Sequence, residues 1–146
     1  TTRIGYGLIE KDRGLKLLDC GLIDGEGLAP QERLLNIERE FNKILEKHRP
    51  DYICIERLFF TKNKKTASAV SEARGVLLLL SQKSGVPIME FSPSDIKAAV
   101  VGDGGADKES VKRMVMITLG IKDVPGPDDV SDALAIAIRG SFERGL

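Results

Sequence analysis

The chain has 146 residues, 42% hydrophobic and 30% charged, which indicates one ordinary globular domain with a sizeable core. Basic and acidic residues both number 22, so the formal net charge is zero; this balance argues mildly against a nucleic-acid binder unless the charges segregate. No apolar stretch approaches the length of a membrane span, and two cysteines are too few for a disulfide framework or a zinc site. We therefore expect no membrane partner and a reducing, cytoplasmic location.

The chain opens with two predicted strands. Ile4, Tyr6 and Leu8 alternate along residues 4–10, and a period of two predicts a strand. A short turn and a second apolar run at 15–23 then predict a hairpin. The first strand begins so abruptly that we expect an element before it to be missing.

Helices and strands alternate after the hairpin. Apolar residues at helical spacing predict helices, and short apolar runs predict strands that are covered on both faces. This order predicts an α/β fold in which helices flank a mixed sheet. The predicted elements are helix 30–47, strand 52–55, helix 66–84, strand 86–91 and helices 93–101, 106–119 and 128–139.

The helix at 66–84 has an unusual second half, which is apolar on every side from Gly75 to Leu80. A surface helix needs only one apolar stripe, so we expect this helix to bury a second face. A homodimer interface is the simplest such face.

Three acids lie beside apolar runs, where a metal-dependent nuclease would need them. Glu56 closes the third predicted strand, and Asp129 and Asp132 precede the apolar half of the last helix. Carboxylates beside buried segments are costly unless paired, protonated or metal-bound, and Mg²⁺ takes oxygen ligands in phosphate chemistry. Each acid also has an ordinary explanation. Asp129 and Asp132 could stabilise the helix macrodipole, by about 0.3–1 kcal/mol each, and Asp128 could be the N-cap of this helix. Glu56 could simply be the first solvated residue after its strand.

The loop after Glu56 mixes aromatic and basic side chains. Cations neutralise phosphates, and a ring can stack on an unpaired base for about 1–3 kcal/mol, so we predict that this loop binds DNA. An ordinary solvated loop with one phenylalanine in the core is the alternative, and either Phe59 or Phe60 could be that core residue. The predicted DNA-binding residues are Arg57, Phe59, Lys62, Lys64 and Lys65; a second basic group, which also suits helix-surface solubility, is Lys97, Lys108, Lys112 and Arg113.

Five short motifs occur in a fixed order over nearly the whole chain. They are Gly5-Tyr6-Gly7, Ile55-Glu56-Arg57-Leu58-Phe59, Glu72-Ala73-Arg74-Gly75, Val100-Val101-Gly102 with Lys108, and the run from Asp129 to Ala137. Together they resemble the RuvC family of bacterial Holliday-junction resolvases, in the RNase H-like superfamily. The resemblance runs from Thr1 to about Ile138 and implies a mixed sheet of five strands flanked by helices.

The resemblance also implies an activity. Members of this family work as homodimers that grip a four-way DNA junction and make two symmetric nicks in recombination and repair. The implied cofactor is Mg²⁺, with two ions per site and Mn²⁺ as a possible substitute, and the implied partners include the RuvA and RuvB branch-migration proteins. By position, Glu56, Asp129 and Asp132 would be catalytic metal ligands. Lys97 and Lys108 would act catalytically at the scissile phosphate, and Phe59 would stack on a base near the crossover.

The chain departs from the family pattern at its start. The family's first strand ends in Ile-Asp-Pro-Gly, whose Asp is a metal ligand, and Thr1 aligns just after that Gly. We therefore expect an incomplete sequence that lacks this strand and binds metal weakly as written. The rival functions are another RNase H-like nuclease, acting on RNA or replication intermediates, and a catalytically inactive junction-binding protein.

Overall fold

The computed structural model describes residues 3–57 and 64–143, without the side chains of residues 64 and 65. The chain divides into two compact units. Unit 1 comprises Thr1–Ile4, Ile23–Ile53 and Leu58–Ile88, and unit 2 comprises Gly5–Leu22, Cys54–Arg57 and Met89–Leu146. None of the helices described in these units is both long and apolar enough to cross a bilayer.

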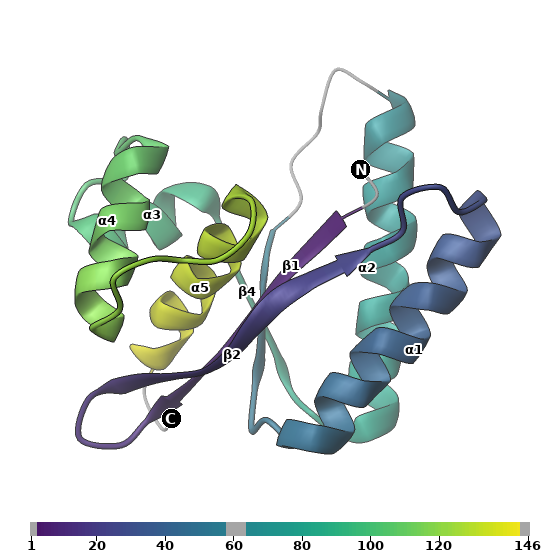
Figure 1. Cartoon of the computed structure of the whole chain (residues 1–146), viewed down its shortest axis with the longest axis horizontal. Helices are drawn as coiled ribbons and strands as arrows, with labels where there is room; N and C mark the ends of the chain where they lie inside the picture. The colour runs from purple at the N-terminus through teal and green to yellow at the C-terminus, as the bar shows by residue number, and fades with distance from the viewer. Residues whose placement is uncertain (1–2, 58–63, 144–146) are drawn as a thin grey trace. The chain divides into compact units, whose positions relative to one another are not determined.

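The described residues form four strands in two pairs (Figure 1). β1 (Arg3–Lys11) pairs with β2 (Leu15–Asp24), and β3 (Ile53–Glu56) pairs with β4 (Ile88–Phe91). The predicted strands are thus all present. Within the described part of the chain the two pairs are not hydrogen-bonded to each other, so the five-stranded sheet implied by the resemblance is not complete there.

The two pairs differ in strand direction. β1 and β2 form an antiparallel hairpin whose turn includes Arg13 in the left-handed region, with φ of 59°. In the other pair, the Ile53 N–H donates to the Pro87 carbonyl and the Arg57 N–H donates to the Phe91 carbonyl. Donors and acceptors advance together along the chain, so β3 and β4 run parallel.

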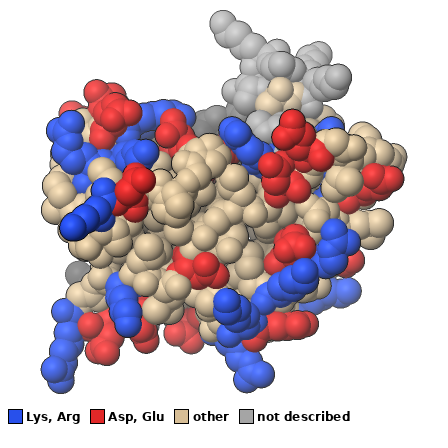
Figure 2. Space-filling model, in the orientation of Figure 1, with Lys and Arg blue, Asp and Glu red and all other residues tan. Residues whose placement is uncertain are grey.

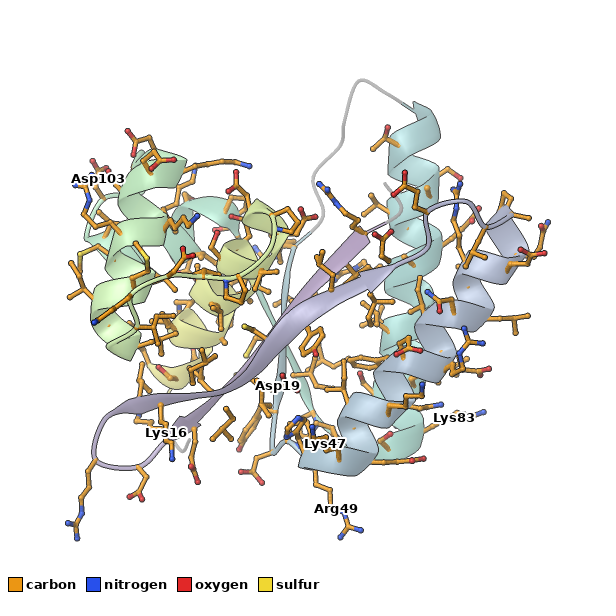
Figure 3. All side chains as sticks on the ribbon, in the orientation of Figure 1. Lys16, Asp19, Lys47, Arg49, Lys83 and Asp103 are labelled. Atoms are coloured by element: carbon orange, nitrogen blue, oxygen red, sulfur yellow. The ribbon has the colours of Figure 1, made fainter. Side chains whose placement is uncertain are left out.

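Unit 1 is built on α1 (Pro30–His48) and α2 (Lys64–Ser84), which pack against each other. Buried Asn36 donates from Nδ2 to the Asp24 carbonyl at 3.1 Å, which ties α1 to the end of β2. Arg49 ends α1 with a left-handed φ of 46°, and its N–H donates to the Leu45 carbonyl. Lys47 and Arg49 lie at this end (Figure 3), where positive charge complements the helix macrodipole.

Unit 2 holds α3 (Pro93–Val101), α4 (Lys108–Leu119) and α5 (Asp128–Ser141), and each of the three contacts the other two. Its core is centred on α5, where Leu134 is fully buried and Val130 and Ile138 are 1% exposed. Val115 of α4 is also fully buried. The apolar half of the last predicted helix therefore lies at the centre of this unit.

The starts of these helices confirm one prediction and correct two. Ser92 caps α3 by accepting the Asp95 N–H at 3.2 Å, with proline at the first helical position as predicted. α4 begins at Lys108 and not at residue 106, because Asp107 is extended and caps the helix. Asp128 is not the N-cap of α5: Pro127 holds that position, and Asp128 is already helical.

Glycines let α5 lie directly on the strands of unit 2. A Cβ on Gly5 would collide with the backbone carbonyl of Asp129, and a Cβ on Gly7 would collide with the Leu134 side chain. These two glycines are two apart on β1 and so share one face of the strand. At the other end of the helix, a Cβ on Gly140 would collide with the Cys54 sulfur of β3. The first turn of α5 is therefore positioned by backbone contact with β1.

We predict that Gly5→Ala destabilises the protein by about 1–3 kcal/mol, because the added methyl group must push the first turn of α5 away from β1. Chemical denaturation of both forms measures the difference. Gly75→Ala is the matched control, since Gly75 lies inside α2 with open space around its Cβ position. That change should stabilise the chain by roughly 0.5–1 kcal/mol; an equal effect of both substitutions would contradict close seating of α5.

Candidate active site

The structure places all three predicted acids in unit 2, at the end of β3 and the start of α5. Glu56 is the last residue of β3, and Asp129 and Asp132 lie in the first two turns of α5. As whole residues Glu56 and Asp132 are exposed, although neighbouring atoms partly shield their carboxyl groups from water; Asp129 is half-buried. Their elements are held together by the packing of α5 described above, so residues far apart in the sequence lie in one region.

Burial and neighbouring charges shift the ionisation of both Glu56 and Asp132. Partial burial raises the pKa of Glu56 above its ordinary value of 4.5, and the negative charge of Asp132 raises this pKa further. Partial burial likewise raises the pKa of Asp132 above 3.8, and the nearby charges of Asp128 and Asp129 add to this effect. The acids therefore form a region of mutual repulsion, which a bound cation would relieve.

Two lysines oppose this repulsion. The positive charges of Lys97 and Lys108 lower the pKa of both Glu56 and Asp132, against the effect of burial. Lys97 is half-buried in α3, and Lys108 is the first residue of α4. Two lysines from two different helices therefore act on both acids, and we call Glu56, Asp132, Lys97 and Lys108 the acid–lysine cluster.

The turn between α3 and α4 sets the place of Lys108. Gly102 ends α3 with φ of 90°, and its N–H donates to the Ala98 carbonyl at 2.8 Å. Asp103, labelled in Figure 3, accepts the Gly105 N–H at 2.9 Å. This glycine-rich segment is thus a helix C-cap followed by a tight turn.

The chemistry of the acids suits a hard cation, although the full ligand set stays a prediction. Among the residues that the structure describes, no group of three acids, histidines or cysteines is arranged to hold a metal ion. Mg²⁺ is commonly held through one or two carboxylates, with water and substrate phosphate as the other ligands. Glu56 and Asp132 fit that requirement, and Asp129 acts electrostatically on Asp132.

The predicted DNA-binding loop is only partly described. Arg57 is exposed, and its backbone N–H donates to the Phe91 carbonyl at 2.7 Å, which extends the β3–β4 ladder just beyond Glu56. Phe59, Phe60 and Lys62 lie outside the described residues. The same is true of the side chains of Lys64 and Lys65, whose backbone begins α2.

Charges of both signs are interspersed over the face shown in Figure 2, as expected from a net charge of zero. A broad basic field of the kind typical of small DNA-binding domains is not seen on that face.

Arg139 near the end of α5 was not singled out from the sequence. Its guanidinium bonds to Asp95 of α3 and to Glu143, and it lies over the ring of Phe91. The only sequence signal was a basic residue in the last turn of a helix, which is ordinary macrodipole chemistry. Nothing in the sequence links it to an acid 44 positions away.

Comparison with known proteins identifies the family. The family model described as crossover junction endodeoxyribonuclease RuvC matches residues 1–140. The chain belongs to the RuvC family. RuvC of Chloroflexus aggregans is 46% identical over 140 residues, which cover 94% of this chain and 85% of that protein. RuvC of Pelotomaculum thermopropionicum is 43% identical with the same coverage.

Solved RuvC structures agree with this assignment. A structure of Thermus thermophilus RuvC matches with a TM-score of 0.86 and 32% identity, covering 97% of this chain and 88% of that chain. T. thermophilus RuvC in complex with a Holliday junction substrate matches with a TM-score of 0.90 and 31% identity, covering 97% and 87%. The predicted family, the RNase H-like α/β fold and the endonuclease class are thereby confirmed.

We predict that Glu56→Gln raises the free energy of unfolding of the metal-free protein at neutral pH. A carboxyl group whose pKa is raised by folding stabilises the fold below its ordinary pKa, and this contribution is lost as the pH rises through the folded value. Glutamine stays neutral, so the gain should disappear below the ordinary value of 4.5. Urea denaturation at several pH values measures it, and the exposed Glu46→Gln of α1 is the control. A stability difference between the two forms that does not change with pH would show that the charge of Glu56 is not its cause.

Proposed function

We propose that this RuvC-family chain resolves four-way DNA junctions by hydrolysing phosphodiester bonds at the acid–lysine cluster. The observation that carries the proposal is that Lys97 of α3 and Lys108 of α4 act electrostatically on both Glu56 of β3 and Asp132 of α5, and that Asp132 also acts on Glu56. A site that pairs carboxylates with lysines suits phosphate chemistry, because the acids attract a cation and the lysines attract the substrate anion. One similar solved structure holds a Holliday junction substrate, which supports this choice of substrate.

RuvC-family nucleases generally depend on a divalent metal, and the finer assignment here is a proposal. We assign Glu56, Asp129 and Asp132 as the carboxylates that hold Mg²⁺, with two ions per site and Mn²⁺ as a substitute. When bound, such ions supply an activated water and stabilise the leaving oxygen. The raised pKa values of Glu56 and Asp132 support a cation site, because both groups repel each other without one.

The lysines have two tasks in this proposal. Their positive charges favour the ionised forms of Glu56 and Asp132, and only ionised carboxylates hold a divalent cation well. Lys97 and Lys108 also stabilise the negative charge that develops on the phosphate in the transition state.

DNA contacts outside the cluster are assigned from the sequence. Arg57 is exposed beside Glu56, where a guanidinium could hold backbone phosphate next to the scissile bond. We propose that Phe59 stacks on a base at the crossover and that Lys62, Lys64 and Lys65 contact phosphates. Stacking of this kind favours an opened junction over a closed duplex, because a paired base is already stacked.

We propose that the chain works as a homodimer on a junction of two-fold symmetry, so that each subunit nicks one of two equivalent strands. Leu79 of α2 is 56% exposed and Leu35 of α1 is 62% exposed, and these two helices pack together in unit 1. Exposed leucines of this kind suit an apolar interface. RuvA and RuvB are proposed as partners in the bacterial cytoplasm, and their addition should stimulate cleavage in the assay below.

We predict paired, symmetric, Mg²⁺-dependent nicks in a synthetic four-way junction and none in a linear duplex of the same sequence. Glu56→Gln should lower the cleavage rate by roughly 100-fold or more while sparing junction binding, because it removes a cation ligand without changing shape. Gel-based cleavage and binding assays measure both quantities, with Glu46→Gln as the control. Unpaired nicks would contradict the dimer.

The same assay separates the rival functions. It uses this chain and a second form in which a strand that ends in Ile-Asp-Pro-Gly precedes Thr1. Junction binding without cleavage in both forms would favour an inactive binding protein. Cleavage of RNA or of replication forks in preference to the junction would favour another RNase H-like nuclease, and retained cleavage in Glu56→Gln would exclude Glu56 from the site.

We predict that Phe59→Ala slows junction cleavage by about 10-fold or more while affecting duplex binding by less than about 2-fold, because one base–aromatic stack is worth about 1–3 kcal/mol. Single-turnover cleavage and duplex titration measure the two effects. Phe60→Ala is the matched neighbour. Equal losses of cleavage and duplex binding in Phe59→Ala would indicate that Phe59 is a core residue. A larger cleavage defect in Phe60→Ala than in Phe59→Ala would show that Phe60 is the residue that stacks on DNA.

A further inference from the structure

The last turn of α5 carries a guanidinium with three partners. Arg139 Nε donates to Asp95 Oδ1 at 2.9 Å, and its Nη1 lies 2.9 Å from Glu143 Oε1. The guanidinium carbon lies 4.3 Å from the centre of the Phe91 ring, and only 18% of the side chain is exposed. A planar fork with two carboxylates and a ring is held in one orientation, which an ammonium group could not reproduce.

The bond to Asp95 joins α5 to the helix that carries Lys97. Asp95 is in the first turn of α3, two residues before Lys97. The buried neighbours of Asp95 on this helix are Ile96 and Val100, each 6% exposed, and these apolar contacts hold α3 on the core. Apolar contact tolerates small sliding and rotation, whereas a charged hydrogen bond has a defined direction and length. The ion pair therefore gives α3 a defined orientation relative to α5, which apolar packing alone does not.

The contact with Phe91 joins the same guanidinium to the strands. Phe91 ends β4, and its carbonyl accepts the N–H of Arg57, the residue directly after Glu56. Arg139 itself lies about two helical turns after Asp132 on α5. Arg139 belongs to α5, pairs with Asp95 of α3, and is linked to β3 through Phe91. These are three of the four elements that supply the acid–lysine cluster.

We propose that the Asp95–Arg139 ion pair is a positioning device that fixes α3 relative to α5 and thereby aims Lys97 at the reacting phosphate. This inference rests on the proposed function, since it assigns a supporting role around the same site. Neither residue touches substrate: Asp95 and Arg139 act through Lys97. The chemical reason is that transition-state stabilisation by a charged group falls steeply when that group is misplaced by fractions of an ångström.

A purely structural role would have a different signature. The Asp95 side chain is 42% exposed, so water screens its side of the ion pair, and Glu143 remains to pair with the guanidinium when Asp95 is removed. Loss of Asp95 should therefore leave the fold nearly as stable as before. A positioning role predicts the opposite balance, with a clear loss of rate and little change in folding or binding.

The test compares the two carboxylate partners of Arg139. Asp95→Ala should lower the single-turnover rate of junction cleavage by about 5–50-fold, with the junction Kd changed by less than about 2-fold. Glu143→Ala removes the other carboxylate, which lies beyond the end of α5 on no element of the cluster, and should leave the rate near that of the parent chain. Equal rate losses in both variants would overturn the proposal, and so would an unchanged rate in Asp95→Ala.

A double-mutant cycle with Lys97→Ala then separates this inference from the proposed function. If Asp95 acts through Lys97, Asp95→Ala should slow the parent chain but cause no further loss in the Lys97→Ala background. If the rate losses of the two single variants multiply in the double variant, Asp95 does not act through Lys97. The positioning role would then be overturned, while Lys97 would keep its own role at the site. An unchanged rate in Lys97→Ala alone would instead remove that lysine from the proposed function and this inference with it. Urea denaturation of each variant shows whether it is folded.

Discussion

The close approach of α5 to the strands of unit 2 is the constraint on which the candidate site depends. Gly5 and Gly7 leave no side chain between β1 and the first half of the helix, and Gly140 does the same opposite Cys54 of β3. The helix centre is then sealed by Val130, Leu134 and Ile138, which are almost completely buried. Because the apolar face is fixed in this way, the polar residues of the first turns have no freedom to move elsewhere.

That seating explains why carboxylates can lie at an energetically unfavourable place. Glu56 and Asp132 are partly desolvated and repel each other, a cost that the buried apolar contacts of α5 can sustain. The lysines of α3 and α4 offset part of the repulsion without neutralising it. When the nearby charges of Asp128 and Asp129 are counted with Glu56 and Asp132, the acids of this region outnumber its two lysines. Under the proposed function, that excess would attract a cation and the lysines would attract the substrate phosphate.

The helices around α5 serve this arrangement through their ends. Ser92 and Asp107 cap α3 and α4, so Lys97 and Lys108 occupy defined positions within one or two turns of a fixed helix start. Arg139 joins the far end of α5 to the start of α3. The packing of unit 2 and the electrostatics of the cluster are therefore coupled: a change in the seating of α5 would move an acid and a lysine together.

The sequence by itself determined the elements, the family and the candidate acids. Periods of two and 3.6 placed the strands and helices, because these periods follow from backbone geometry. The errors were shifts of one or two residues at the ends of elements, such as the start of α4 at Lys108, where Asp107 serves as cap, and the start of β4 at Ile88. Motif order was enough for the RuvC resemblance, which the family match over residues 1–140 confirms.

Only the tertiary structure decided which of those residues meet. Glu56 and Asp132 are far apart in the chain, and their mutual repulsion appears only when α5 lies on the strands. The pairing of Arg139 with Asp95 is likewise a product of helix packing. A local pattern reports what one segment prefers, whereas distances between segments depend on the side chains that are absent or buried at their contacts, here the glycines beneath α5.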